Sequence, residues 1–134
     1  MTAHIRSASR KSITEHRYVS TLLSMIDTEL RAIFFHGFSD RSRLAILEQL
    51  AGGERRVSDI VAATGFTQPN VSGHLACLWD CGLVAREKRG REVYYRLVEG
   101  VGELLGAADL VLEQAGETVG ACPRYGIPSR RAAA

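Results

Sequence analysis

The sequence predicts a mainly α-helical chain with one small β-hairpin, arranged as a winged helix-turn-helix. Residues 58–64 read as a short helix that a glycine turn joins to a second, capped helix over residues 67–81. Residues 84–97 follow directly and read as a basic β-hairpin, the wing, with Arg89-Gly90-Arg91 at its tip. Amphipathic helices are predicted on both sides of this unit, so the chain has the usual parts of the fold.

Length and composition limit the classes of protein to which this chain can belong. A chain of 134 residues with 46% hydrophobic and 24% charged residues is typical of one globular domain. No apolar run approaches the roughly 18 residues of a membrane span, and the N-terminus has no apolar signal core, so we expect a cytoplasmic protein without a membrane partner. We find no nucleophile–base–acid constellation and no glycine-rich phosphate loop, so the sequence does not predict an enzyme.

Three regions are predicted along the chain. Residues 1–11 form a flexible basic arm, residues 12–116 form the DNA-binding and dimerisation domain, and residues 117–134 form a loosely structured tail that carries Cys122. Ser12 and Glu15 resemble a capping box that opens a long first helix, which should end by Gly37.

The helices that follow have recognisable ends and apolar faces. Asp40 can cap a helix that stops at Gly52-Gly53 and turns Leu44, Leu47 and Leu50 inward, and Ser58 can cap the short helix that ends at Gly65. The last helix is predicted over about residues 99–115 and carries a broad apolar stripe. Because the first and last helices bracket a small core, we expect them to pair with a second copy in a twofold homodimer.

The helix over residues 67–81 has two functional halves. Thr67 can cap its start, Pro69 suits its first turn, and Gly82 can supply a left-handed stop. At about 100° per residue, one face buries Val71, Leu75 and Leu78, while a different strip carries Asn70, His74, Cys77 and Cys81.

Polar and basic residues of this helix and the wing indicate a DNA partner. The net charge is only +2, but cations cluster in residues 86–96 and can follow phosphates. The alternatives are a solvated basic face and, for Asn70 and Ser72, local capping of their own helix. The residues that we expect to contact double-stranded DNA are Gln68, Asn70, Ser72, His74, Arg89 and Arg91.

The chain has three cysteines, Cys77, Cys81 and Cys122. An odd number argues against a disulfide framework, which leaves metal binding, redox sensing and simple burial open. Cys77 and Cys81 are one helical turn apart, a spacing at which two thiols can converge on one soft metal ion.

Taken together and in this order, four motifs resemble the ArsR/SmtB family of metal-responsive winged-helix repressors. They are S-D-R-S-R-L-A-I-L at 39–47, V-S-G-H-L-A-C-L at 71–78, G-L-V at 82–84 and R-G-R-E-V-Y-Y-R-L at 89–97. Within the family the chain is most similar to the cadmium- and lead-sensing branch, often called CmtR-type, whose pattern H-L-x-C-L-x-x-C-G-L-V is present here. It departs from other branches in having R-R-V-S-D-I, without a thiol, where those carry cysteines before the helix-turn-helix.

The resemblance implies a function and a site. It implies a repressor that binds operator DNA as a dimer and is released when Cd(II) or Pb(II) binds Cys77, Cys81 and Cys122. Zn(II) and As(III) are further possible effectors, since As(III) also tolerates three sulfurs and zinc could add water or His74 as a fourth ligand. The alternative is a repressor of the same fold in which Cys77 and Cys81 form a thiol-redox or persulfide switch.

Overall fold

The computed structural model describes residues 27–131, which divide between two compact units, residues 1–41 and residues 42–134. In the first unit, helix α2 (Asp27–His36) ends one residue before Gly37, as the sequence predicts. An ion pair of 2.8 Å joins Asp27 to Arg31 one turn later. The predictions for residues 1–26, namely the basic arm, the Ser12 capping box and the start of the first helix, lie outside the described residues. No helix in the described part of the chain is both long and apolar enough to cross a membrane.

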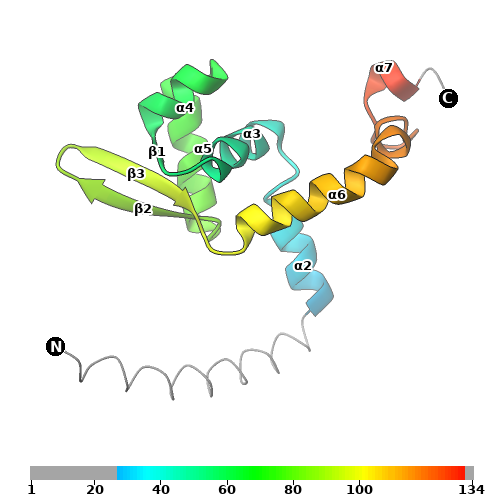
Figure 1. Cartoon of the computed structure of the whole chain (residues 1–134), viewed down its shortest axis with the longest axis horizontal. Helices are drawn as coiled ribbons and strands as arrows, with labels where there is room; N and C mark the ends of the chain where they lie inside the picture. Colours follow the sequence, from blue (N-terminus) through cyan, green and yellow to red (C-terminus); the bar gives the residue numbers. More distant parts are fainter. Residues whose placement is uncertain (1–26, 132–134) are drawn as a thin grey trace. The chain divides into compact units, whose positions relative to one another are not determined.

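The winged helix-turn-helix is formed by elements of the second unit, and Figure 1 shows their order. The helices are α3 (Arg41–Ala51), α4 (Val57–Thr64), α5 (Gln68–Asp80), α6 (Val101–Gly120) and the short α7 (Pro128–Arg131). The strands are β1 (Arg55–Arg56), β2 (Val84–Arg89) and β3 (Glu92–Leu97). The predicted fold class is therefore confirmed.

The core lies where α3, α4 and α5 meet. Six side chains there are fully buried: Ile46, Leu47, Ile60, Val71, Leu75 and Leu78. The inward positions predicted for α5 are confirmed, and in α3 Leu47 and Leu50 are buried while Leu44 is half-buried. Burial of branched aliphatic side chains supplies the driving force that fixes α5 against α3 and α4.

Helix α4 begins one residue earlier than its predicted cap, so the assignment of Ser58 as the cap is wrong. The N-cap residue is Arg56, and Ser58 lies in the first turn. The carboxylate of Asp59 accepts a hydrogen bond of 2.9 Å from the Arg56 backbone N–H and so satisfies an amide at the helix start. Gly65 ends the helix in the left-handed conformation (φ 73°), as predicted.

The wing is a three-stranded antiparallel sheet in the order β1–β3–β2, not a hairpin alone. The sequence predicts β2 and β3 but misses β1, because a strand of two arginines has no alternating pattern. Arg55 pairs with Tyr95 and Arg56 with Tyr94. The turn between β2 and β3 is Gly90-Arg91, and Gly90 has a φ of 63°, which favours glycine.

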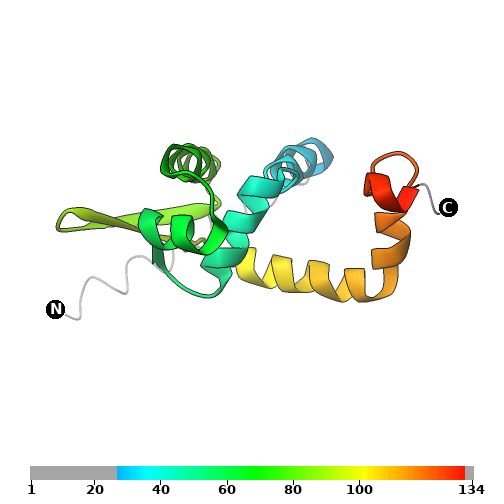
Figure 2. The same cartoon turned by 90° about the horizontal axis from the view of Figure 1, so that it is seen from above.

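Helix α6 is longer than predicted, since it runs on to Gly120 instead of stopping near Ala115. Figure 2 shows it leading away from the end of β3. Only its two ends, Val101 and Gly120, are buried, although its sequence is largely apolar. It also holds four glycines, of which Gly102, Gly106 and Gly116 lie inside the helix.

Candidate functional site

The first half of α5 presents polar side chains to solvent. Thr67 caps the helix, since its hydroxyl oxygen accepts a hydrogen bond of 3.4 Å from the Asn70 backbone N–H. Gln68, Asn70 and Ser72 are exposed, and His74 is half-buried. These side chains are available to a partner, because the apolar residues that anchor the helix are on its other side.

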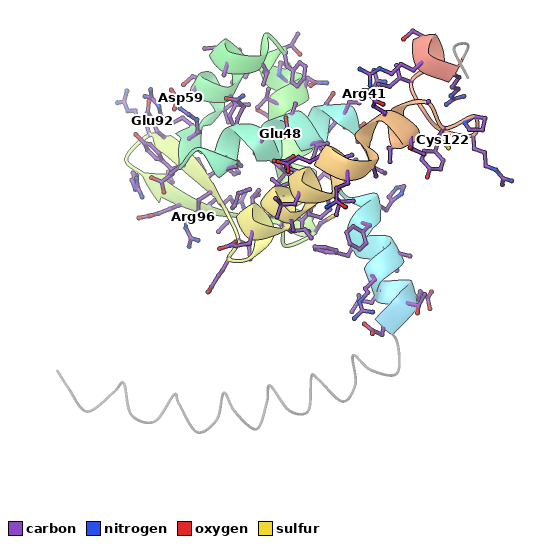
Figure 3. All side chains as sticks on the ribbon, turned by 45° about the vertical axis from the view of Figure 1, so that its right-hand side comes forward. Arg41, Glu48, Asp59, Glu92, Arg96 and Cys122 are labelled. Atoms are coloured by element: carbon purple, nitrogen blue, oxygen red, sulfur yellow. The ribbon has the colours of Figure 1, made fainter. Side chains whose placement is uncertain are left out.

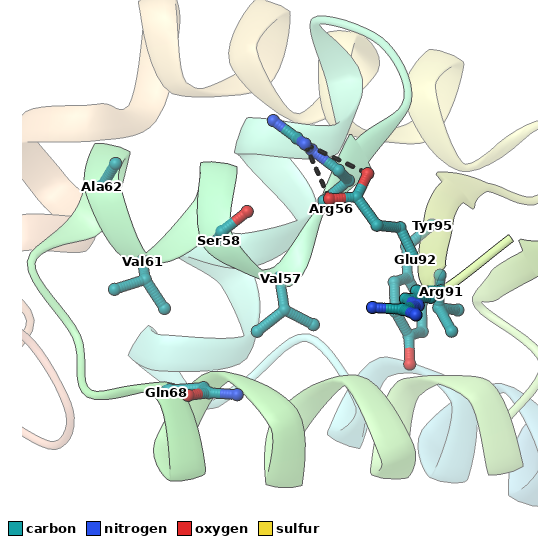
Figure 4. Close-up of a pocket in the computed structure, with 10 residues that line it drawn as sticks. Arg56, Val57, Ser58, Val61, Ala62, Gln68, Arg91, Glu92 and Tyr95 are labelled. Atoms are coloured by element: carbon teal, nitrogen blue, oxygen red, sulfur yellow. Dashed lines mark hydrogen bonds and ion pairs between the residues drawn. The ribbon is translucent and has the colours of Figure 1, made fainter. Parts of the chain in front are cut away.

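A groove of about 520 Å³ separates α4 and the start of α5 from β3. Figure 4 shows Ser58 on α4, Gln68 on α5 and Arg91 on the wing around it. Its floor is mostly apolar, with Val57, Val61, Ala62, Val93 and Tyr95 among the lining residues. The groove thus joins the two elements that the sequence predicts to contact DNA.

The two arginines of the wing tip have different surroundings. Arg89 makes ion pairs with Glu54 and with Glu87, the latter at 2.8 Å, and these carboxylates raise the pKa of its guanidinium. Arg91 is exposed and has no ion pair within the part of the chain that the structure describes. Sequence reasoning treated the two alike and missed Glu54, which is distant in sequence from the wing.

Cys77 and Cys81 lie one helical turn apart at the end of α5, as the sequence predicts. Cys81 is the C-cap residue, and its backbone N–H donates to the Cys77 carbonyl at 2.9 Å. Burial raises the pKa of the Cys81 thiol, and the neighbouring Cys77 thiol raises it further. Cys77 is half-buried and Cys81 is exposed, so both sulfurs can be reached from outside. Two adjacent, accessible thiols fit a soft metal ion well.

Trp79 lies between these cysteines in the sequence but on the other side of the helix, where it contacts the wing. The Arg86 guanidinium of β2 stacks over the indole, with Cζ 3.8 Å from the ring centroid. The tryptophan is 43% exposed, and it is the only one in the chain. Trp79 therefore joins the C-terminal end of α5 to the wing, and its fluorescence can report a movement of that end.

Cys122 lies in an ordered turn, which corrects the expectation of a loosely structured tail. The Gly126 N–H donates to the Cys122 carbonyl and the Ile127 N–H to the Gly120 carbonyl, both at 2.8 Å. Backbone N–H groups of Tyr125 and Arg124 donate to the Cys122 thiol and lower its pKa. Because these donors stabilise the thiolate, Cys122 should lose its proton at a lower pH than an ordinary cysteine does.

The structure brings Cys77 and Cys81 together but does not add Cys122 to them. Among residues 27–131, no group of three or more Cys, His, Asp or Glu side chains could hold a metal ion. Figure 3 shows Cys122 beyond the end of α6, whereas Asp59 and Glu92 lie near the wing. A site with all three cysteines therefore needs a movement of the tail or a second protomer.

Gly126→Ala should shift the reaction of Cys122 to higher pH. A Cβ at Gly126 would be 2.5 Å from the Gly120 carbonyl oxygen and 2.6 Å from the Cys122 backbone, so the turn must open. Loss of the amide donors destabilises the thiolate and raises the pKa toward its ordinary value. The measurement is the alkylation rate of Cys122 against pH, followed by mass spectrometry of reduced protein.

The matched control is Gly116→Ala in α6, where the added Cβ would make an ordinary contact of 4.0 Å with Leu112. It should leave the alkylation profile unchanged. In the wild type, Cys122 should react at lower pH than Cys81, because the pKa of Cys122 is lowered while that of Cys81 is raised. Equal profiles for the wild type and Gly126→Ala would show that the turn does not activate the thiol.

Comparison with known proteins identifies the family. The family described as bacterial regulatory protein, arsR family, matches residues 40–86. A probable mercury resistance operon repressor of Streptomyces lividans is 41% identical over 69 residues, which cover 52% of this chain and 54% of the relative. The HTH-type transcriptional regulator CmtR of Mycobacterium tuberculosis is 39% identical over 72 residues, which cover 50% of this chain and 61% of the relative. The matches thus span little more than half the length of these two curated relatives.

A solved structure extends the likeness beyond the helix-turn-helix. The homodimeric winged helix-turn-helix DNA-binding domain of Mb0332 from Mycobacterium bovis, described as a possible ArsR-family transcriptional regulator, is 31% identical with a TM-score of 0.63. The match covers 72% of this chain and 90% of that domain. On its sequence, its winged fold and these matches, the chain belongs to the ArsR family, which is a family of DNA-binding transcriptional regulators and not of enzymes.

Proposed function

We propose that this protein is a metal-responsive repressor, which binds operator DNA as a homodimer and releases it when a soft metal ion binds Cys77, Cys81 and Cys122. The observation that carries the proposal is the placement of Cys77 and Cys81 on neighbouring turns at the end of α5, the helix whose first half presents polar side chains. Relatives named as a mercury resistance operon repressor and as CmtR support the same reading.

The DNA contacts come from α5 and the wing. Exposed amide and hydroxyl groups can read base edges or bind phosphate, and a wing-tip arginine can bind phosphate or enter the minor groove. We assign these contacts to Gln68, Asn70, Ser72, His74 and Arg91. Arg89 lies at the same tip with its guanidinium engaged by two carboxylates.

Three cysteine thiolates are soft ligands, so we expect them to select a soft metal ion as the effector. Thiolates favour Cd(II) and Pb(II) over Mg, Ca or Mn, and As(III) also accepts three sulfurs. Zn(II) prefers a fourth ligand, for which water or the half-buried His74 is available. Since thiols must lose protons to bind, the affinity should rise with pH.

Coupling to DNA follows from the position of the ligands. Cys77 lies in the DNA-reading helix and Cys81 caps its end, while Trp79, on the other side of the same turn, stacks against Arg86 of the wing. An ion bound by all three sulfurs would connect Cys122 to Cys77 and Cys81, and so connect the tail to the helix. If the linked form has lower affinity for DNA, the ion lowers operator affinity by the same factor as DNA lowers ion affinity.

The homodimer is assigned to α6 together with the first helix. Val111, Leu112 and Val119 lie on the apolar stripe of α6 and are 62%, 47% and 41% exposed. Exposed apolar surface of this kind is typical of an interface. Two copies would present two recognition helices to an inverted-repeat operator.

The proposal is tested by an anaerobic titration of reduced protein with Cd(II). We expect saturation at one ion per chain, thiolate-to-metal charge-transfer absorption and a change in Trp79 fluorescence. The same titration should release a labelled duplex, selected beforehand from a random-sequence pool, as seen by fluorescence anisotropy. A duplex that stays bound at saturating Cd(II) would contradict the proposal.

A second candidate keeps the fold and makes the cysteines a redox or persulfide switch. The observation that favours it is that Cys77 and Cys81 lie on neighbouring turns and that the Cys77 thiol raises the pKa of the Cys81 thiol. It predicts DNA release by diamide or a persulfide donor, without metal and without need of Cys122. Release by these reagents, together with no effect of Cd(II), would decide for this candidate.

A further inference from the structure

The tip of the wing is fastened to the loop before β1 through Arg89. Its Nη1 and Nη2 donate hydrogen bonds to Oε1 and Oε2 of Glu54, the second at 3.0 Å. Nη2 also donates a hydrogen bond of 2.8 Å to the Glu87 carboxylate. The guanidinium also lies over the Tyr94 ring, 4.6 Å from its centroid. The bidentate pairing of the Arg89 guanidinium with the Glu54 carboxylate fixes the orientation of the two groups as well as their separation.

A second arginine, Arg56 of β1, holds strand β3 of the wing close to the same tip. Arg56 binds both oxygens of Glu92 on β3, at 2.9 and 3.1 Å, and both oxygens of Asp59 on α4, at 3.1 Å each (Figure 4 draws the pairing with Glu92). The Tyr94 hydroxyl donates to the same Glu92 carboxylate at 3.3 Å. The wing is thus tied to the loop before β1 and to the first helix of the helix-turn-helix.

Both clusters carry more negative than positive charge. Arg89 with Glu54 and Glu87 has a net charge of −1, and Arg56 with Asp59 and Glu92 also has −1. Each guanidinium is already surrounded by carboxylates, so neither cluster attracts a phosphate. Arg91 differs, because it is exposed beside the groove without an ion pair among residues 27–131.

We propose that Glu54 and Arg89 are positioning residues: their ion pair sets the wing so that Arg91 reaches the DNA backbone. Arg89 therefore acts on DNA through Arg91 and not by touching phosphate itself. This inference rests on the proposed DNA-binding function and assigns different roles to the two arginines of one wing tip. It also gives Glu54, a negative residue, a favourable role in binding a polyanion.

The test is the effect of Glu54→Gln on affinity for the selected duplex, measured by anisotropy without metal. Direct phosphate contact by Arg89 predicts tighter binding in this variant, because a negative charge is lost and Arg89 is released. Positioning predicts the opposite, a loss of about two- to fivefold, the size expected for an exposed ion pair. Glu48→Gln is the control, since it removes an exposed carboxylate of α3 that makes no ion pair in the described residues.

Two further variants separate positioning from a general loss of structure. Arg89→Lys should bind as weakly as Arg89→Gln, because an ammonium group cannot span both oxygens of Glu54, whereas it would still bind a phosphate. In an Arg91→Gln background, Glu54→Gln should have no further effect, because the ion pair acts through Arg91. Circular dichroism of each variant checks that the fold is retained.

Tighter binding by Glu54→Gln, or full affinity of Arg89→Lys, would overturn the inference. An undiminished effect of Glu54→Gln in the Arg91→Gln background would overturn it as well. Failure of the wild type to bind any duplex from the pool is seen before the variants are compared, and it would overturn the proposed function together with the inference.

Discussion

Cys77→Ser is expected to bind the selected duplex like the wild type and to keep it bound when Cd(II) is added. The wild type should lose about 5- to 150-fold in DNA affinity at saturating Cd(II), the usual range of coupling between two sites. Serine has nearly the shape of cysteine at this half-buried position, so the fold and the exposed polar face of α5 remain. It removes a soft ligand from the site, and the coupling disappears with the ligand.

Cys122→Ser separates binding from coupling in the same experiment. The Cys77–Cys81 pair is intact in this variant, so some Cd(II) binding should remain, with weaker charge-transfer absorption. Without the tail ligand, the bound ion should release DNA poorly. A Cys77→Ser protein that still releases DNA on addition of Cd(II) would move the site to other residues.

Val111→Glu or Leu112→Glu is expected to convert the dimer into monomers. At 100° per residue, both positions share the apolar stripe of α6, and burying an unpaired carboxylate in an interface is strongly unfavourable. A monomer carries one recognition helix, so DNA affinity should fall by roughly 10²–10⁴-fold as bivalent binding is lost. Analytical ultracentrifugation measures the oligomeric state, and anisotropy measures the affinity.

Leu110→Glu is the matched control for this pair. Leu110 is as exposed as Val111, at 62% each, but helical geometry places it on the opposite side of α6. The control should remain dimeric and retain its DNA affinity. Dissociation by Leu110→Glu, with no effect of the other two changes, would place the interface on the other side of the helix.

The elements with strong local signals were predictable from the sequence. The Thr67 cap, the glycines at 65 and 82 and the spacing of Val71, Leu75 and Leu78 locate α5, because each signal acts within a few residues. The placement of Cys77 and Cys81 on neighbouring turns follows from the same helical period. The family resemblance, carried by motifs spread over residues 39–97, is confirmed by the comparisons.

Features that depend on distant partners were not predictable. Strand β1 exists because Arg55 and Arg56 pair with β3 some forty residues later, and Arg89 is held by Glu54 across a similar interval. Helix α6 continues past the predicted end near Ala115 to Gly120, and the ordered turn around Cys122 follows it. A metal site that contains Cys122 together with Cys77 and Cys81 requires movement of the tail or a second protomer. No pattern of neighbouring residues in the sequence can predict either of these.

The glycines of α6 make its folding depend on association. Each of the three interior glycines costs about 0.5–1 kcal/mol of helix stability relative to alanine, and Leu110, Val111, Leu112 and Val119 of this helix are exposed in the described part of the chain. An isolated protomer therefore has little to hold the far half of α6 in helical form. In the proposed dimer, helix formation and dimerisation would be coupled, and we expect the stability of this regulator to rise with its own concentration.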